Sequence, residues 1–273
     1  MASKNRLIYG ALIGDYGGSI YHGSSSMDEK LQLMSQDVYT PESHYTDDTV
    51  MTVALAHALY YRTDITVAYR YFASRYPSCG YGNKFLEWVW DDDRKAYGSR
   101  GMGAAMRVSP VAYFASDEED CKEIAKKSAS ITHNSEEGIR SAITAALMVY
   151  YALHGKEKEF LTEVAEEAYP SCSSLDLEKL HREVRFSPLA EDAMPLAMYA
   201  FLSSKDMSDC LHRVCYIGGD SDSIGAVACA IASAFYKKVP SMLLIPVLDN
   251  LPSEFSSLLD IIPLPVDVGQ EGY

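Results

Sequence analysis

The sequence lacks the cysteine patterns and the long apolar runs that mark several classes of protein. Its six cysteines form no Cys-x-x-Cys pair and no zinc-site spacing, so we expect them to be reduced and mostly buried. No window approaches the ~18 uninterrupted apolar residues of a membrane-spanning helix. The short apolar run near the N-terminus is broken by Asp15 and several glycines, which is unlike a secretory signal. We therefore expect a cytoplasmic protein without a membrane span.

Basic residues are few for the number of acidic ones. The chain of 273 residues has 24 Lys and Arg against 38 Asp and Glu, which gives a formal net charge of −14 at pH 7. This balance disfavours nucleic acid and anionic membrane as general partners, because both repel an acidic protein. Hydrophobic residues make up 48% of the chain, which is enough to bury a sizeable core. A small ligand or a metal ion fits this composition better.

The alternation of apolar and polar residues that is typical of β-strands is also scarce. Apolar residues instead recur at spacings of three and four, in stripes that begin at Val50, Ile139 and Ile224. A fourth stripe surrounds Pro195, which we expect in the first turn of its helix. Because no internal repeat or linker divides the chain, we predict one all-α domain over residues 1–273, folded as a compact helical bundle.

Two clusters of carboxylate and hydroxyl side chains stand directly before two of these stripes. The first is TDDT at residues 46–49, and the second lies in GGDSDSIGA at residues 218–226. Each cluster alone could be a helix cap, because such side chains accept hydrogen bonds from the free N–H groups of a first turn. If the clusters face one another, their carboxylates repel unless cations neutralise them, and oxygen ligands without His or Cys select Mg²⁺, Mn²⁺ or Ca²⁺. Both interpretations fit the pattern. The six candidate ligands are Thr46, Asp47, Asp48, Asp220, Asp222 and Ser223.

Five segments occur together in an order and spacing that are known from one family. They are GALIGDYGGSIYHG, YTDDTVMTVALAHAL, YGSRGMGAAMRVSP, THNSEEG and GGDSDSIGAVACAIASAFY. With these motifs the chain resembles the ADP-ribosylglycohydrolase family, from about Ile8 to about Pro240. The resemblance implies an orthogonal all-α bundle that acts on ADP-ribose or on ADP-ribosylated proteins. It also implies that the six candidate ligands hold two Mg²⁺ ions, or Mn²⁺, with Asp47 and Asp222 taking part in catalysis.

The resemblance further implies a ligand-binding segment that is rich in glycine. In the family this segment cradles the diphosphate and ribose of ADP-ribose, and exposed backbone N–H groups suit that role. Its residues here are Gly98, Ser99, Arg100, Gly101, Met102 and Gly103. Arg100 could contact phosphate, although an exposed arginine is more often simply solvated. His133 is similar to the family's histidine near the ligand, and the alternative is a helix-start histidine that is satisfied by backbone groups.

Two positions depart from the family pattern. His22 stands where many members have a glutamate that acts on the water or the leaving group. An imidazole beside two divalent cations cannot supply that negative charge, and losing a positioned acid or base costs about 10²–10⁴-fold in rate. Acidic residues of the same loop, such as Asp28, Glu29 and Glu42, are alternatives for that role, although they are more often just solvated. At Met102 the family commonly has Asn, whose amide hydrogen bonds Met cannot reproduce.

Three functions follow from these observations. The leading one is a Mg²⁺-dependent hydrolase that removes ADP-ribose from a modified side chain or small molecule. The second is an ADP-ribose-binding relative in which His22 impairs turnover. The third is a structural role, which the retention of all six metal-ligand side chains disfavours.

Overall fold

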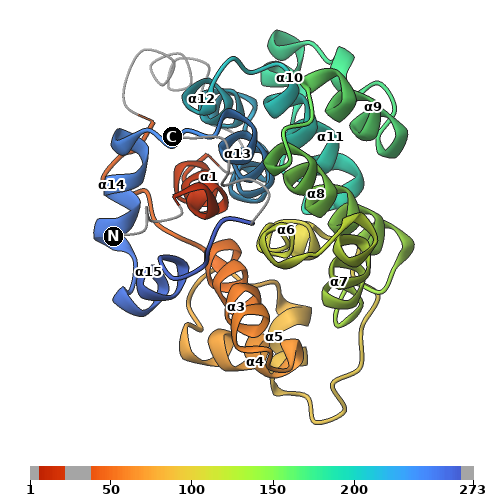
Figure 1. Cartoon of the computed structure of the whole chain (residues 1–273), viewed down its shortest axis with the longest axis vertical. Helices are drawn as coiled ribbons and strands as arrows, with labels where there is room; N and C mark the ends of the chain where they lie inside the picture. The colour runs from red at the N-terminus through yellow and green to blue at the C-terminus, as the bar shows by residue number, and fades with distance from the viewer. Residues whose placement is uncertain (1–5, 22–37, 266–273) are drawn as a thin grey trace.

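The computed structural model describes residues 6–21 and 38–265, and within these ranges every regular element is a helix (Figure 1). The predicted all-α class is therefore confirmed. Gly101 and Leu189 form an isolated antiparallel bridge that brings the glycine-rich segment against a distant part of the chain. No helix in the described ranges is long and apolar enough to cross a lipid bilayer.

The helices follow one another with connections that are mostly short. In chain order they are η1 (Leu7–Tyr9), α1 (Gly10–Gly18), α3 (Asp47–Tyr61), α4 (Ile65–Arg75), α5 (Asn83–Trp90), η2 (Met102–Ala104), α6 (Val111–Phe114), α7 (Glu118–Ser130), α8 (Glu136–Leu153), α9 (Lys158–Ala168), η3 (Cys172–Ser174), α10 (Leu177–Glu183), α11 (Ala190–Leu202), α12 (Met207–Ile217), α13 (Ser221–Tyr236), α14 (Ser241–Asn250) and α15 (Ser253–Leu259).

The apolar stripes of the sequence lie on helices that face the core. The stripes that begin at Val50, Ile139 and Ile224 belong to α3, α8 and α13, and most of their residues are buried. The expectation for Pro195 is wrong, because α11 begins earlier and Pro195 lies inside it. Two carboxylates occupy the first turn of α11, where acidic side chains favour a helix start.

Helices α1 and α13 cross in direct backbone contact near the centre of the molecule (Figure 1). A Cβ atom on Gly14 would lie 1.9 Å from the carbonyl oxygen of Gly225, and a Cβ atom on Gly18 would lie 2.1 Å from that of Ser221. Only glycine fits at such a distance, since any side chain would push the two backbones apart. This crossing brings the end of α1 beside the start of α13, which are far apart in the sequence.

Candidate functional site

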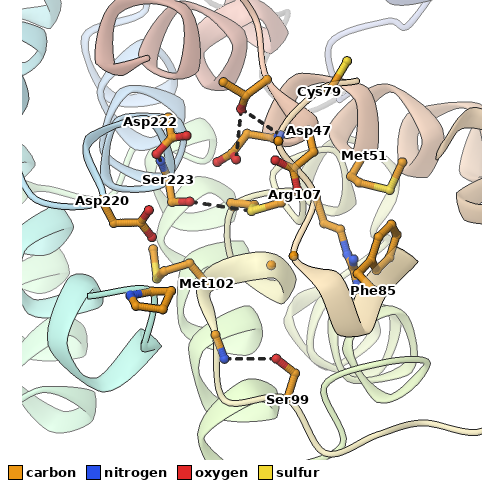
Figure 2. A pocket seen from close by; sticks show the side chains of 18 of the residues that line it. Asp47, Met51, Cys79, Phe85, Ser99, Met102, Arg107, Asp220, Asp222 and Ser223 are labelled. Carbon is orange, nitrogen blue, oxygen red and sulfur yellow. Dashed lines mark hydrogen bonds between the residues drawn. The ribbon is translucent and has the colours of Figure 1, made fainter. Parts of the chain in front are cut away.

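A cavity of about 930 Å³ opens where the N-terminal ends of α3 and α13 meet the glycine-rich segment before η2. In Figure 2, Asp220 and Asp222 lie on one side of the cavity, Asp47 lies across from them, and Ser99 lies farther along the wall. A cavity of this size suits a ligand as large as a nucleotide.

The six predicted metal ligands all line this cavity. At the start of α3, Thr46 is the N-cap residue, and its Oγ1 accepts a hydrogen bond of 3.2 Å from the backbone N–H of Asp48. At the start of α13, Asp220 occupies the N-cap position, but its side chain makes no capping hydrogen bond. Capping therefore accounts for Thr46 and does not account for Asp220.

Asp15 is a further carboxylate at this site, and the sequence interpretation missed it. It lies on α1, fully buried, and carboxylate oxygens of Asp15, Asp48 and Asp222 all lie within 4.8 Å of one another. Its Oδ2 accepts hydrogen bonds from the backbone N–H groups of Thr46 (2.9 Å) and Thr49 (3.0 Å), and Thr46 Oγ1 donates to its Oδ1 at 2.7 Å. The sequence did contain a sign of this role, which is a lone aspartate in an apolar, glycine-rich helix. A carboxylate buried in such a helix needs hydrogen-bond or charged partners.

Burial and mutual repulsion dominate the electrostatics of the carboxylates. Burial, and then the charge of Asp222, raise the pKa of Asp15 to about 6. The same two causes raise the pKa values of Asp47 and Asp48 well above the usual range, with further contributions from Asp15 and Asp220. The carboxylates therefore keep their charge at neutral pH only at a high cost in free energy.

Three of these carboxylates have no cationic side chain paired with them in the part of the chain that the structure describes. Among the described residues, no lysine or arginine forms an ion pair with Asp15, Asp47 or Asp48. In the same part of the chain, the buried Oδ1 atom of Asp48 has no hydrogen-bond partner. A buried carboxylate oxygen that lies beside other carboxylates and has no hydrogen-bond partner is typical of a metal ligand. A set of ligands made only of oxygens suits hard divalent cations. This cluster could hold a metal ion.

The glycine-rich segment forms another part of the cavity wall. Ser99, Gly101, Met102 and Gly103 line the cavity, and Ser99 Oγ accepts a hydrogen bond of 3.2 Å from the backbone N–H of Gly101 (Figure 2). The other two predicted residues of the segment, Gly98 and Arg100, are not among the lining residues. The Gly98 N–H donates to Asn134 Oδ1 at 2.8 Å, and the Arg100 guanidinium, which is about half exposed, pairs with Glu191.

His133 also lines the cavity, as its predicted role near a ligand requires. Its ring packs on Gly103, where an added Cβ atom would lie 2.9 Å from the ring. The ring partner is a side chain, not the backbone, because Nδ1 lies 2.7 Å from Thr132 Oγ1. Burial, and then the charge of Arg107, hold the pKa of His133 well below its usual range, so the ring is neutral.

Arg107 and Phe85 are cavity residues that the sequence interpretation did not single out. The Arg107 guanidinium lies 4.2 Å from the ring centroid of Tyr69 and 6.0 Å from that of Phe85. Figure 2 shows Arg107 beside Phe85. With 1% of its surface exposed, Arg107 is the largest fully buried side chain among the described residues. The motif GAAMRVSP contains it, and an arginine inside an apolar run was the only sign in the sequence.

Comparison with known proteins decides the family. The sequence model of the family described as ADP-ribosylglycohydrolase matches residues 6–263. The chain belongs to the ADP-ribosylglycohydrolase family. It is 30% identical to ADP-ribosylhydrolase ARH3 of Homo sapiens over 303 aligned positions, which cover 83% of each protein. It is 25% identical to ADP-ribosyl-[dinitrogen reductase] glycohydrolase of Rhodospirillum rubrum, over 79% of this chain and 74% of the relative.

A solved structure supports the same fold. The structure of an ADP-ribosylglycohydrolase-related protein complex superposes with a TM-score of 0.70 at 21% identity, and the match covers 93% of this chain and 94% of that one. The predicted resemblance is confirmed, and so is the prediction that the chain is an enzyme of the ADP-ribosylglycohydrolase kind, at the level of the family.

One of the two positions that depart from the family pattern lies outside the described residues. His22 belongs to residues 22–37, as do Asp28 and Glu29. Glu42, a further carboxylate of the same loop, is exposed and is not among the residues that line the cavity. It accepts a hydrogen bond of 2.7 Å from the Thr40 hydroxyl instead.

Proposed function

We propose that this chain is a divalent-cation-dependent hydrolase that releases ADP-ribose from a modified side chain or small molecule. One observation carries the proposal: Asp15, Asp48 and Asp222 bring buried carboxylate oxygens within 4.8 Å of one another beside a cavity that suits a nucleotide. Family membership supports it, as do relatives whose names describe ADP-ribosylhydrolase and ADP-ribosyl glycohydrolase activity.

Two Mg²⁺ ions, or Mn²⁺ in their place, are the proposed cofactors. When bound, such cations supply positive charge that orients and polarises the sugar oxygens near the bond to be cleaved. The chain's own contribution is to hold the cations, with Asp47 on one side of the cavity and Asp222 on the other (Figure 2). The proposed ligands are Thr46, Asp47, Asp48, Asp220, Asp222 and Ser223, and Asp15 completes the cluster.

The glycine-rich wall is the proposed site for the rest of ADP-ribose. Ser99, Gly101 and Gly103 line the cavity beyond the carboxylates, and the small side chains let a ligand approach the backbone. His133 faces the same part of the cavity. Gly98 is hydrogen-bonded to Asn134, and Arg100 is paired with Glu191. We therefore propose that these two residues shape the segment and do not contact the ligand.

The decisive experiment is to incubate the protein with several ADP-ribosylated acceptors and to measure free ADP-ribose. We expect release in Mg²⁺, loss of release after treatment with a chelator, and recovery when Mg²⁺ returns. Calorimetric titration with ADP-ribose gives an independent measure of binding. Neither release nor binding in Mg²⁺ would reject the proposed function.

A second candidate is an ADP-ribose-binding protein with impaired turnover. One observation favours it: every carboxylate that lines the cavity from the described residues is an aspartate, so none of them replaces the glutamate that His22 displaces. A His22→Glu variant should then hydrolyse faster than the parent by about 10²–10⁴-fold, the usual effect of a positioned acid or base. A parent that already matches the variant rules out this candidate.

A further inference from the structure

Arg107 makes few polar contacts for a charged side chain that is buried. Among the described residues, its Nη2 donates a hydrogen bond of 2.8 Å to Thr132 Oγ1, and its buried Nε has no partner. The guanidinium is held against the face of Tyr69, at 4.2 Å from the ring centroid. A guanidinium has donors only, so it always takes a lone pair of the Thr132 hydroxyl and never the proton of that hydroxyl.

The proton of the Thr132 hydroxyl then needs an acceptor of its own. Thr132 is fully buried, and in the part of the chain that the structure describes, its Oγ1 contacts only Arg107 Nη2 and His133 Nδ1, the latter at 2.7 Å. If Nδ1 carried a proton and donated it to Oγ1, the hydroxyl proton would be buried without an acceptor. If the hydroxyl donates to Nδ1, all three groups are satisfied.

A neutral imidazole that accepts at Nδ1 carries its proton on Nε2. The Nε2 edge of His133 is turned towards the glycine-rich wall, since an added Cβ atom would lie 2.9 Å from Nε2 at Gly103 and 4.0 Å at Gly101. Gly101, Gly103 and His133 all line the cavity. Among the described residues, Nε2 has no hydrogen-bond partner, so its proton is available to a ligand.

We propose that Arg107 acts through Thr132 as a positioning residue, holding His133 in the tautomer whose Nε2–H donates to an acceptor oxygen of the ligand. The opposite tautomer would turn a lone pair towards the cavity and would repel an oxygen that can only accept, such as a phosphate oxygen. Burial of the ring next to a fixed positive charge keeps it neutral, so the donor is present throughout the neutral pH range. That the ligand is ADP-ribose rests on the function proposed above, whereas the tautomer does not depend on it.

Nitrogen NMR of the histidine rings tests this proposal on the full chain without added metal. Ring nitrogens with and without a proton have clearly separated ¹⁵N shifts, and a His133→Gln variant identifies the His133 signals among those of the seven histidines. We expect a protonated Nε2 and an unprotonated Nδ1 in the parent. A protonated Nδ1 in the parent overturns the proposal, and this measurement needs no variant at Thr132.

Variants of Thr132 test the relay itself. Thr132→Val removes the hydroxyl at nearly constant volume and should give a mixture of tautomers, with ADP-ribose affinity in Mg²⁺ reduced roughly tenfold, as for loss of one aligned hydrogen bond. Thr132→Ser keeps the hydroxyl and should restore both the shifts and most of the affinity. Thr162→Val on α9, whose hydroxyl donates to the Lys158 carbonyl oxygen at 2.8 Å, is the matched control and should change neither.

The outcomes separate this proposal from the proposed function. A Thr132→Val variant that keeps the parent's shifts and affinity overturns the relay, even if the enzyme releases ADP-ribose normally. A parent with the predicted tautomer that neither binds nor hydrolyses ADP-ribosylated compounds supports the relay and rejects the function.

Discussion

Asp15 and Thr46 are joined by two hydrogen bonds, one from the backbone N–H of Thr46 to Oδ2 (2.9 Å) and one from its hydroxyl to Oδ1 (2.7 Å). The carboxylate of α1 thus holds the start of α3 in place while lying within 4.8 Å of carboxylate oxygens on Asp48 and Asp222. One side chain therefore fixes the position of the first acidic cluster and adds its charge to the second.

Substitutions of Asp15 should separate these two roles. Asp15→Asn keeps one carbonyl oxygen as an acceptor and removes the charge, so we expect little loss of metal-free stability but at least about tenfold weaker Mg²⁺ binding. Asp15→Ala leaves the buried N–H groups of Thr46 and Thr49 without an acceptor and should cost roughly 1–3 kcal/mol of unfolding free energy per unsatisfied group. Chemical denaturation and calorimetry measure both quantities.

The matched control for Asp15 is Asp64→Asn. Asp64 also accepts a backbone hydrogen bond at a helix start, from Val67 N at 3.0 Å, but it lies exposed at α4. Its substitution should leave Mg²⁺ binding unchanged. If Asp15→Asn binds Mg²⁺ as tightly as the parent and as the control, Asp15 contributes no charge to the metal site.

Removing the charge of Asp222 should strengthen the metal-free protein or leave it unchanged. Its charge raises the pKa values of Asp15, Asp47 and Asp48, so Asp222→Asn relieves repulsion while it removes a proposed ligand. We expect an unchanged or higher melting temperature without metal, and a loss of at least about a hundredfold in Mg²⁺-dependent ADP-ribose release. The exposed Asp192→Asn on α11 serves as the control, and equal activity of the two variants would contradict the assignment of Asp222.

The pH dependence of stability should be weaker with metal than without it. Folding raises the pKa of Asp15 to about 6 and raises those of Asp47 and Asp48 further above their usual range, so the folded, metal-free protein binds more protons than the unfolded chain. Its stability should therefore fall as pH rises from about 4 through 6 and beyond. Saturating Mg²⁺ should oppose this fall, because cations bind the deprotonated carboxylates.

Melting temperatures across this pH range, with Mg²⁺ and with a chelator, check the prediction. The stabilisation by Mg²⁺ should grow with pH. A difference between the two conditions that stays constant from pH 5 to 8 would mean that the carboxylates do not titrate together with cation binding.

The crossing of α1 and α13 should tolerate no side chain at its centre. A Cβ atom on Gly14 would meet the carbonyl oxygen of Gly225 at 1.9 Å, so Gly14→Ala must separate the helices and should cost at least about 1–3 kcal/mol. Gly82→Ala is the control, since nothing lies within 4 Å of a Cβ atom there. Denaturation curves should show a large loss for the first variant and almost none for the second. Equal stabilities would show that the helices can move apart freely.

Local patterns predicted the parts of this molecule that depend on neighbouring residues. Apolar spacing identified α3, α8 and α13, and the acidic segments before α3 and α13 do line one cavity. The position of Pro195 was misjudged because a proline is common in first turns, whereas α11 begins at Ala190, where Glu191 and Asp192 favour a helix start. The assignment of one domain to residues 1–273 stays a prediction.

The sequence did not predict contacts between segments that lie far apart along the chain. Asp15 looked like an interruption of an apolar run, and it becomes part of the site only because Gly14 and Gly225 let two backbones touch. From the sequence, Arg107 could not be told apart from an exposed arginine. Its burial depends on contacts with aromatic rings from α4 and α5, which are distant in the sequence. Neither relationship has a fixed spacing along the chain.

The close crossing of α1 and α13 also determines when the carboxylate cluster can exist during synthesis. A nascent chain carries Asp15 and Asp48 early, but the partner carboxylate of Asp222 leaves the ribosome only after most of the helices are made. The proposed cation site is therefore incomplete until about four-fifths of the chain has emerged. We therefore expect cation binding to be a late event in folding, which stabilises the completed fold and does not direct the folding of the incomplete chain.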